Sequence, residues 1–257
     1  MYTQNAIVCG SPGTNLLGVS HDVSSLVGHL KSPFGGAFGV NNTDEVWSDD
    51  DLQYSSLISR FDAIKPNQKY DYFLFYFSGH GYTNPENVQD LRIIVGNGKG
   101  GECYISAHKI VHLVQSISNK SVLIFDCCRT IPHVPKFSLG DKLSLITESI
   151  SSSGLTHDMG RKLFSEQVNR CPNGSAALLS CSLNEYSMDS PYGGEYTRAL
   201  IDETYKWVEF KDNSKVLPLG HTFTEQMQRY YDGKTYTQTP TFMYTDERML
   251  GLPFAVK

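Results

Sequence analysis

Residues 70–81 read YDYFLFYFSGHG, a nearly unbroken apolar run that ends abruptly in a histidine between two glycines. Residues 121–128 read SVLIFDCC, a second apolar run that ends in an aspartate and two cysteines. Continuous rather than alternating apolar residues are typical of strands that are buried on both faces of a parallel sheet. The two segments therefore predict buried strands that carry chemically reactive residues at their carboxyl ends.

The rest of the chain alternates between short apolar runs and helix-like segments. Residues 5–9 and 176–180 predict two more strands, and the glycines of residues 96–101 predict a turn between short strands. This alternation predicts an α/β fold, a three-layer α/β/α sandwich with a mostly parallel central sheet. There is no internal repeat and no clean linker, which predicts one domain over residues 1–257. Helical or amphipathic stretches are expected at residues 19–30, 50–64, 107–116, 196–208 and 223–231.

Composition narrows the class of protein. The 257 residues carry a formal net charge of −5, and 40% of them are hydrophobic while 19% are charged. These values exclude a disordered chain and argue against electrostatic binding of nucleic acid. A membrane-spanning helix needs about 18 apolar residues, and no apolar run approaches that length; the first residues also lack the pattern of a secretory signal. We therefore expect a cytoplasmic globular protein with no nucleic acid or membrane partner.

A histidine and a cysteine follow the two most strongly predicted strands. Ligand sites of open parallel sheets lie at the carboxyl ends of the strands, so we expect His80 and Cys128 to cooperate at one edge. A cysteine thiol, with a pKa of about 8.5, is mostly protonated at neutral pH, and a nearby imidazole withdraws its proton. The residue types and their positions predict nucleophilic catalysis by a cysteine.

These motifs resemble the caspase and metacaspase family of cysteine peptidases. That family has SGHG after an aromatic strand and a cysteine after a second apolar strand, about 50 residues later. The resemblance continues in GTNLLGVSHD (residues 13–22), in CSLNEYSMD (residues 181–189) and in QTPT (residues 238–241). It therefore covers nearly the whole chain, and it is closer to metacaspases than to true caspases.

The resemblance implies a role for each residue of the motifs. His80 is the general base and acid, and Cys128 is the nucleophile. The backbone N–H groups of Gly81 and Cys128 form the oxyanion hole. Cys127 points the other way from its strand and packs in the core.

The resemblance also implies a pocket for the residue before the cleaved bond. True caspases use an arginine to bind aspartate, but the loop after the first strand reads GSPG (residues 10–13) and supplies none. In metacaspases a pocket for Arg or Lys is formed by residues that match Asp22, Ser78 and Asp126. Two carboxylates that repel each other favour a bound cation, and arginine adds bidentate geometry. We predict cleavage after Arg, then Lys, with Ser187 and Asp189 in the same wall of the pocket.

Residues 130–174 are expected to form a long loop, because prolines, glycines and serines interrupt any periodicity. The resemblance makes this loop an activation segment, cut by the protein itself or by another protease. We therefore expect a zymogen of regulatory or cell-death and defence type, whose partners are protein or peptide substrates and an activating protease or regulatory partner. The basic residues that offer cleavage sites are Lys136, Lys142, Arg161, Lys162 and Arg170.

No cofactor or metal is predicted. The stretch after SGHG offers only Glu86 and Asp90, whereas calcium prefers several oxygen ligands at once. His108 and His112 have a metal-compatible spacing but no third ligand. Two other interpretations remain open: a catalytically silent caspase-like interaction module, and a different thiol chemistry, such as acyl transfer, on a flavodoxin-like sheet.

Overall fold

The structure is a computed structural model that describes residues 2–13, 15–46, 48, 51–64, 69–96, 101–130, 137–138, 154–210, 213–231 and 233–257. A six-stranded sheet in the order β15-β9-β7-β3-β1-β2 forms its centre. All neighbouring strands are parallel except β15, which is antiparallel to β9. The mostly parallel sheet predicted from the apolar runs is confirmed. Its strands are β1 (Gln4–Ser11), β2 (Thr43–Val46), β3 (Tyr72–Gly79), β7 (Lys120–Asp126), β9 (Gly174–Leu179) and β15 (Thr241–Tyr244).

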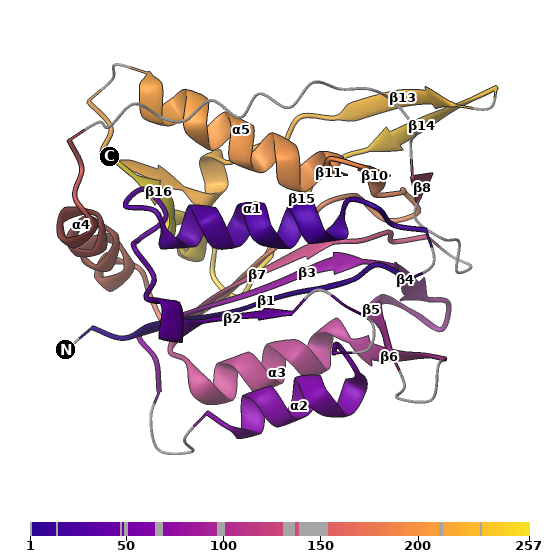
Figure 1. Ribbon diagram of the computed structural model, residues 1–257, viewed down its shortest axis with the longest axis horizontal. Coiled ribbons are helices and arrows are strands. Elements are labelled where there is room, and N and C mark those ends of the chain that lie inside the picture. The colour runs from indigo at the N-terminus through magenta and orange to yellow at the C-terminus, as the bar shows by residue number, and fades with distance from the viewer. Residues whose placement is uncertain are drawn as a thin grey trace.

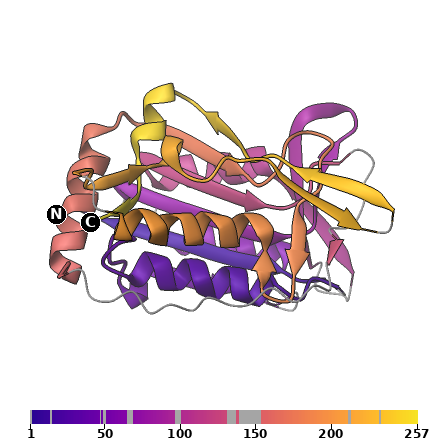
Figure 2. The same ribbon diagram turned by 90° about the horizontal axis from the view of Figure 1, so that it is seen from above.

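Helices cover both faces of the sheet, as Figure 1 shows. Helices α1 (Val19–Lys31) and α5 (Glu195–Glu209) lie on one face, and α2 (Tyr54–Asp62) and α3 (Ala107–Ile117) on the other. Seen from above in Figure 2, α1 and α5 run side by side along the strands. The predicted three-layer α/β/α sandwich is therefore confirmed.

The alternation of side chains along β3 divides the core in two. Tyr72, Leu74 and Tyr76 pack with α1 and α5 in one buried cluster. Phe73 and Phe75 pack with α2 and α3 in the other. All eight residues of β3 are buried, which explains why its sequence is apolar without interruption.

Smaller elements surround the strand ends. Strand β4 begins directly after His80 and belongs to a three-stranded antiparallel sheet, β4-β5-β6. A second small sheet has the order β11-β10-β8, and β13 pairs with β14 in a hairpin. The elements are β4 (Gly81–Asn84), β5 (Asn87–Gly96), β6 (Glu102–Ser106), β8 (Phe137–Ser138), β10 (Met188–Ser190), β11 (Gly193–Gly194), β12 (Val216–Pro218), β13 (Met227–Tyr231), β14 (Lys234–Gln238), β16 (Pro253–Val256), η1 (Val40–Asn42), η2 (Leu219–His221) and η3 (Glu247–Gly251).

Two expectations need correction. Residues 130–174 are not loop throughout, because helix α4 occupies His157–Arg170. Thr156 caps this helix by accepting from Met159 N–H, and Phe164 and Val168 are buried one turn apart. The amphipathic stretch at residues 223–231 ends in strand β13 of the hairpin. Among the described residues, no helix is long and apolar enough to cross a membrane.

Candidate active site

β3 and β7 end side by side at the centre of the sheet. In their parallel register Ser78 lies opposite Asp126, the last pair of the ladder. Tyr76, two positions before Ser78, packs in the core on the α1 and α5 side, and residues two apart on a strand share a face. His80 and Cys128 each follow two residues after this last pair. The residues predicted as base and nucleophile therefore follow adjacent strands at the same end of the sheet.

The imidazole of His80 lies under the loop that follows β1. Only 7% of the residue is exposed, and Nε2 lies 3.0 Å from Oδ1 of Asn15 in a hydrogen bond. Gly13 adopts a φ of +56°, and a Cβ atom there would approach the ring to 3.0 Å. The loop therefore needs glycine where it turns against the imidazole.

Cys128 and Cys127 lie in different surroundings. Cys128 is fully buried, and its Sγ accepts a hydrogen bond from the Ser187 N–H at 3.3 Å. This donor favours the thiolate, whereas the S–H of Cys128 also donates to Ser187 O at 3.7 Å, which favours the neutral thiol. Cys127 belongs instead to the core on the α2 and α3 side, where a Cβ on Gly81 would come within 2.7 Å of its sulfur. Cys127 is thus a packing residue, as expected, and Gly81 must be glycine because of it.

The backbone N–H of Gly81 is directed toward the segment that contains Cys128. Gly81 lies opposite Ile93 in the β4–β5 ladder. The hydrogen bond of 3.0 Å next to this pair runs from Ile94 N–H to His80 O, so Gly81 and Ile93 themselves are a non-hydrogen-bonded pair. The Gly81 N–H therefore points away from β5. Thr83 N–H, on the same edge of β4, donates to Thr130 O at 3.1 Å. That edge consequently faces the residues that follow β7.

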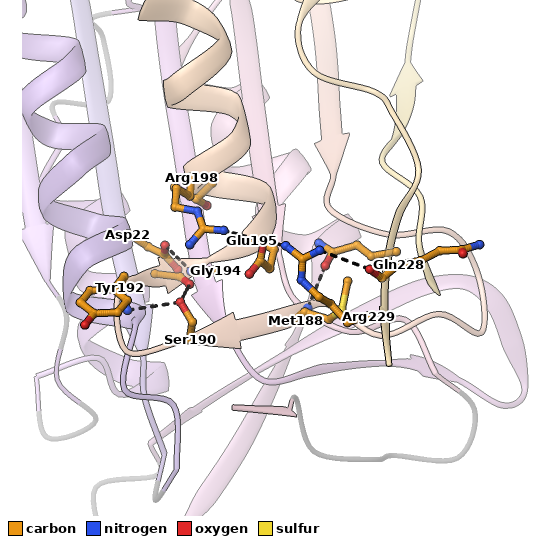
Figure 3. Close-up of polar contacts among 12 residues, drawn as sticks. Asp22, Met188, Ser190, Tyr192, Gly194, Glu195, Arg198, Gln228 and Arg229 are labelled. Atoms are coloured by element: carbon orange, nitrogen blue, oxygen red, sulfur yellow. Dashed lines mark hydrogen bonds and ion pairs between the residues drawn. The ribbon is translucent and has the colours of Figure 1, made fainter. Parts of the chain in front are cut away.

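Two buried carboxylates lie beneath these strand ends. Asp22 accepts hydrogen bonds from Ser78 Oγ at 2.6 Å and from Gly194 N–H at 2.7 Å; the second bond is visible in Figure 3. A Cβ on Gly194 would lie 3.0 Å from Asp22 Oδ2 and closer still to Asp126 Oδ2. Both carboxylates thus flank the same glycine. The structure therefore brings Asp22, Ser78 and Asp126 together.

The first turn of α5 supplies donors to both carboxylates. Gly194, the N-cap residue of α5, donates to Asp22, and Thr197 donates to Asp126 from its N–H at 3.2 Å and from its Oγ1 at 2.7 Å. The N-terminus of a helix carries partial positive charge. Burial of two negative charges at this end of α5 is stabilised by that charge and by the hydrogen bonds.

The hydroxyl group of Tyr76 lies close enough to both carboxylates for their charge to raise its pKa. Its pKa is raised well above 10.0 by burial first, and then by the negative charges of Asp22 and Asp126. Its hydroxyl lies 2.7 Å from Thr197 Oγ1, and that oxygen donates to Asp126. Asp22 and Asp126 therefore both act electrostatically on Tyr76, on the α1 and α5 face of the sheet.

The remaining predicted pocket residues lie on and before β10. Ser187 donates from Oγ to Asp126 and from its N–H to Cys128 Sγ, so it connects the carboxylate to the thiol. Asp189 accepts from the Gly18 N–H at 3.2 Å. All five residues predicted to line the pocket are at most 1% exposed, so their side chains are closed to solvent in this structure.

Comparison with known proteins identifies the family. A sequence model of the caspase domain matches residues 6–249. This chain belongs to the caspase-domain family. Members of the family are cysteine peptidases, which are hydrolases. Nothing in the match separates metacaspases from other caspase-like proteins.

Solved structures agree with this caspase-domain fold, and 124 of their chains match. The crystal structure of protein GSU0716 from Geobacter sulfurreducens superposes with a TM-score of 0.54 at 13% sequence identity, and the alignment covers 99% of this chain and 99% of that chain. At this identity the likeness shows the fold alone. A search of the curated proteins gives no match.

Several residues of the caspase-domain site were not identified from the sequence. Gln238 donates from Nε2 to Ser187 Oγ at 3.3 Å and accepts from Met188 N–H at 2.9 Å; the QTPT motif marks its position. Glu195 is buried and forms ion pairs with Arg198 at 2.7 Å and Arg229 at 3.0 Å, which ties β13 to α5 in Figure 3. The contacts of Gln238 with Ser187 and of Arg229 with Glu195 join residues 51 and 34 positions apart, and no local pattern indicates these pairings.

The basic residues of the predicted activation segment fall into two groups. Arg161, Lys162 and Arg170 lie within helix α4, a conformation that must unwind before a protease can bind it extended. Lys136 and Lys142 lie outside the described residues. Strand β8, from the same segment, pairs in parallel with β10 at Met188 and Asp189.

Proposed function

We propose that this caspase-domain protein is a cysteine endopeptidase that cuts protein substrates after arginine and, more slowly, after lysine, in the manner of metacaspases. One observation carries the proposal. Asp22 and Asp126 bury two carboxylates around Gly194, at the strand ends that His80 and Cys128 follow. A guanidinium between the carboxylates relieves their mutual repulsion, and an acidic side chain is rejected.

The reaction uses the side chains at the two strand ends. Cys128 gives its proton to His80, and the thiolate attacks the carbonyl carbon of the substrate. The oxyanion accepts hydrogen bonds from the N–H groups of Gly81 and Cys128. His80 then gives the proton to the departing amine, which leaves an acyl-enzyme at Cys128. Water deprotonated by His80 hydrolyses the thioester and restores the thiol.

Activation involves the segment that contains β8. β10 is the middle strand of its sheet, with β11 on one side and β8 on the other. A substrate that pairs as an extended strand with β10, next to Asp189, must displace β8. We infer a zymogen that opens when this segment is cut or moved by the protein itself, by another protease or by a regulatory partner. This control suits a cytoplasmic protease of regulatory or cell-death and defence type.

A panel of peptides tests the specificity. Matched fluorogenic substrates ending in Arg, Lys, citrulline or Asp are compared, because citrulline has the shape of arginine without its charge. We expect Arg to be cut fastest and citrulline on the order of 100-fold more slowly, since a desolvated charge pair is lost. Asp22→Asn should remove most of this difference, whereas Asp44→Asn, a carboxylate paired with Arg60 outside the site, should preserve it.

Other outcomes favour the competing interpretations. Faster cleavage after Asp than after Arg rejects the basic pocket. Failure of an arginine-terminated electrophile to label Cys128 in the activated chain rejects the peptidase and leaves a silent interaction module or another thiol chemistry. Activity that is lost in EDTA and restored by calcium contradicts the predicted independence from metals. A Cys128→Ala chain that still appears as two fragments excludes self-cleavage.

A further inference from the structure

One contact of His80 has no part in the mechanism described so far. Nε2 of the imidazole lies 3.0 Å from Oδ1 of Asn15. Asn15 belongs to the loop between β1 and α1, which folds back through a hydrogen bond of 3.1 Å from Leu16 N–H to Pro12 O. An amide oxygen only accepts hydrogen bonds. Nε2 must therefore carry a proton, and Nδ1 becomes the basic nitrogen of the neutral ring.

The order of the strands indicates the direction in which Nδ1 points. β3 lies between β1 and β7 in the sheet. The Cδ2–Nε2 edge of the ring faces the loop after β1, because a Cβ on Gly13 would lie 3.0 Å from Cδ2 and 3.1 Å from Nε2. Nδ1 is on the opposite edge of an imidazole. It therefore lies on the side of the ring away from the loop after β1, and β7, which Cys128 follows, is the neighbour of β3 on its other side.

We propose that Asn15 is a positioning residue that holds His80 in the Nε2–H tautomer and directs Nδ1 at the thiol of Cys128. The inference rests on the proposed cysteine-peptidase function and adds a residue to it. When Nδ1 takes the thiol proton, the ring becomes a cation with two N–H donors. The hydrogen bond from Nε2 to Asn15 then involves a charged donor and strengthens. Asn15 thus stabilises the thiolate–imidazolium pair without touching substrate.

Because Cys128 is fully buried, alkylation by iodoacetamide is measured on the activated chain, where it reports the thiolate without any substrate. Only the thiolate reacts, so the rate is followed from about pH 5 to about pH 10, with tandem mass spectrometry to separate Cys128 from Cys127. In the unmodified chain, we expect the thiolate to form below the ordinary pKa of about 8.5. Asn15→Ala should slow alkylation at neutral pH about 10-fold and move the acid limb upward by about one pH unit.

A second variant separates positioning from a general structural effect. Asn15→Asp places a carboxylate at Nε2, which stabilises the imidazolium further. Its acid limb should stay at or below that of the unmodified chain, opposite to Asn15→Ala. Asn87→Ala serves as the control with an unchanged profile, because Asn87 is an exposed asparagine at the start of β5 that accepts from Gln89 N–H. In peptide assays, Asn15→Ala should lower kcat with little change in KM.

Three results would overturn the inference, and they differ from failure of the proposed function. An alkylation profile of Asn15→Ala that matches the unmodified chain removes Asn15 from the mechanism while leaving the peptidase intact. A nitrogen NMR spectrum that shows His80 with its proton on Nδ1 does the same. If Cys128 of the unmodified chain titrates as an ordinary thiol and no peptide is cut, both the inference and the proposed function are rejected.

Discussion

On the α2 and α3 side of the sheet, β3 and β7 end in apolar side chains: Phe77, Phe125 and Cys127 pack in one buried core. On the α1 and α5 side, the neighbouring residues Ser78 and Asp126 are equally buried but take part in hydrogen bonds with Asp22 and Thr197. The same strand ends therefore support packing on one face and chemistry on the other. A shift of one residue in either strand would exchange the two roles.

The adjacent cysteines give the sharpest test of this comparison. Cys128→Ala should reduce peptidase activity by at least about 10⁴-fold, because it removes the nucleophile. Cys127→Ala should keep most of the activity and lower the free energy of unfolding by about 1 kcal/mol, because it leaves a small cavity under Gly81. Peptide cleavage and urea denaturation of both variants provide the measurement. If Cys127→Ala lost activity and Cys128→Ala kept it, Cys127 would be the nucleophile and the chemistry would lie on the α2 and α3 side.

Much of the fold was predictable because the signals are local. The apolar runs of β3 and β7 and the reactive residues at their ends predicted the sheet and brought His80 and Cys128 to one edge. Helix α4 was missed because Gly160 and several polar residues obscure its short apolar stripe at Phe164 and Val168. A capping threonine before that stripe was the only local signal.

The candidate site was less predictable than the fold. The motifs supplied Asp22 in the first turn of α1, Asp126 at the end of β7 and Ser187 just before β10. They did not indicate that α5 begins against the carboxylates, or that Gln238 and Arg229 support the site from the β13–β14 hairpin. Those contacts join residues 34 to 71 positions apart in the chain, and no periodicity in the sequence carries that information.

His29 and His80 provide a second test of this comparison. Its expected effect is a change of about 3 kcal/mol in the free energy of unfolding. His29 is fully buried, stacked on Phe254, and burial lowers its pKa from 6.5 to about 4 despite a hydrogen bond to Phe254 O. Between these two pH values the unfolded chain binds a proton that the native chain does not. Stability from this group is therefore complete above pH 6.5 and is lost as the pH falls toward 4.

Urea denaturation at a series of pH values measures this loss. The unmodified chain should lose about 3 kcal/mol more than His29→Gln between the two limits, at roughly 1.4 kcal/mol per pH unit. His221→Gln, an exposed histidine in η2, should behave like the unmodified chain. Equal acid sensitivity of the unmodified chain and His29→Gln would assign the loss to carboxylates rather than to His29. The measurement therefore identifies His29 as a packing residue. His80, by contrast, is held by the loop after β1 and is proposed to act in catalysis.

The smallest effect on stability and activity is expected for Arg229, which lies at the solvent-exposed rim of the α1 and α5 side. Arg229 is 41% exposed and pairs with Glu195, but Glu195 keeps Arg198 as a second partner. Arg229→Ala should therefore lower the free energy of unfolding by less than about 1 kcal/mol. It should raise KM about two- to threefold, because the hairpin loses one tether to the first turn of α5 beside Gly194. Steady-state kinetics with Arg248→Ala, whose partner Asp246 lies in a separate exposed pair, supply the matched control. A fall in kcat/KM of more than about 100-fold would mean that Arg229 contacts the substrate itself, and the boundary of the reactive region would then extend along β13.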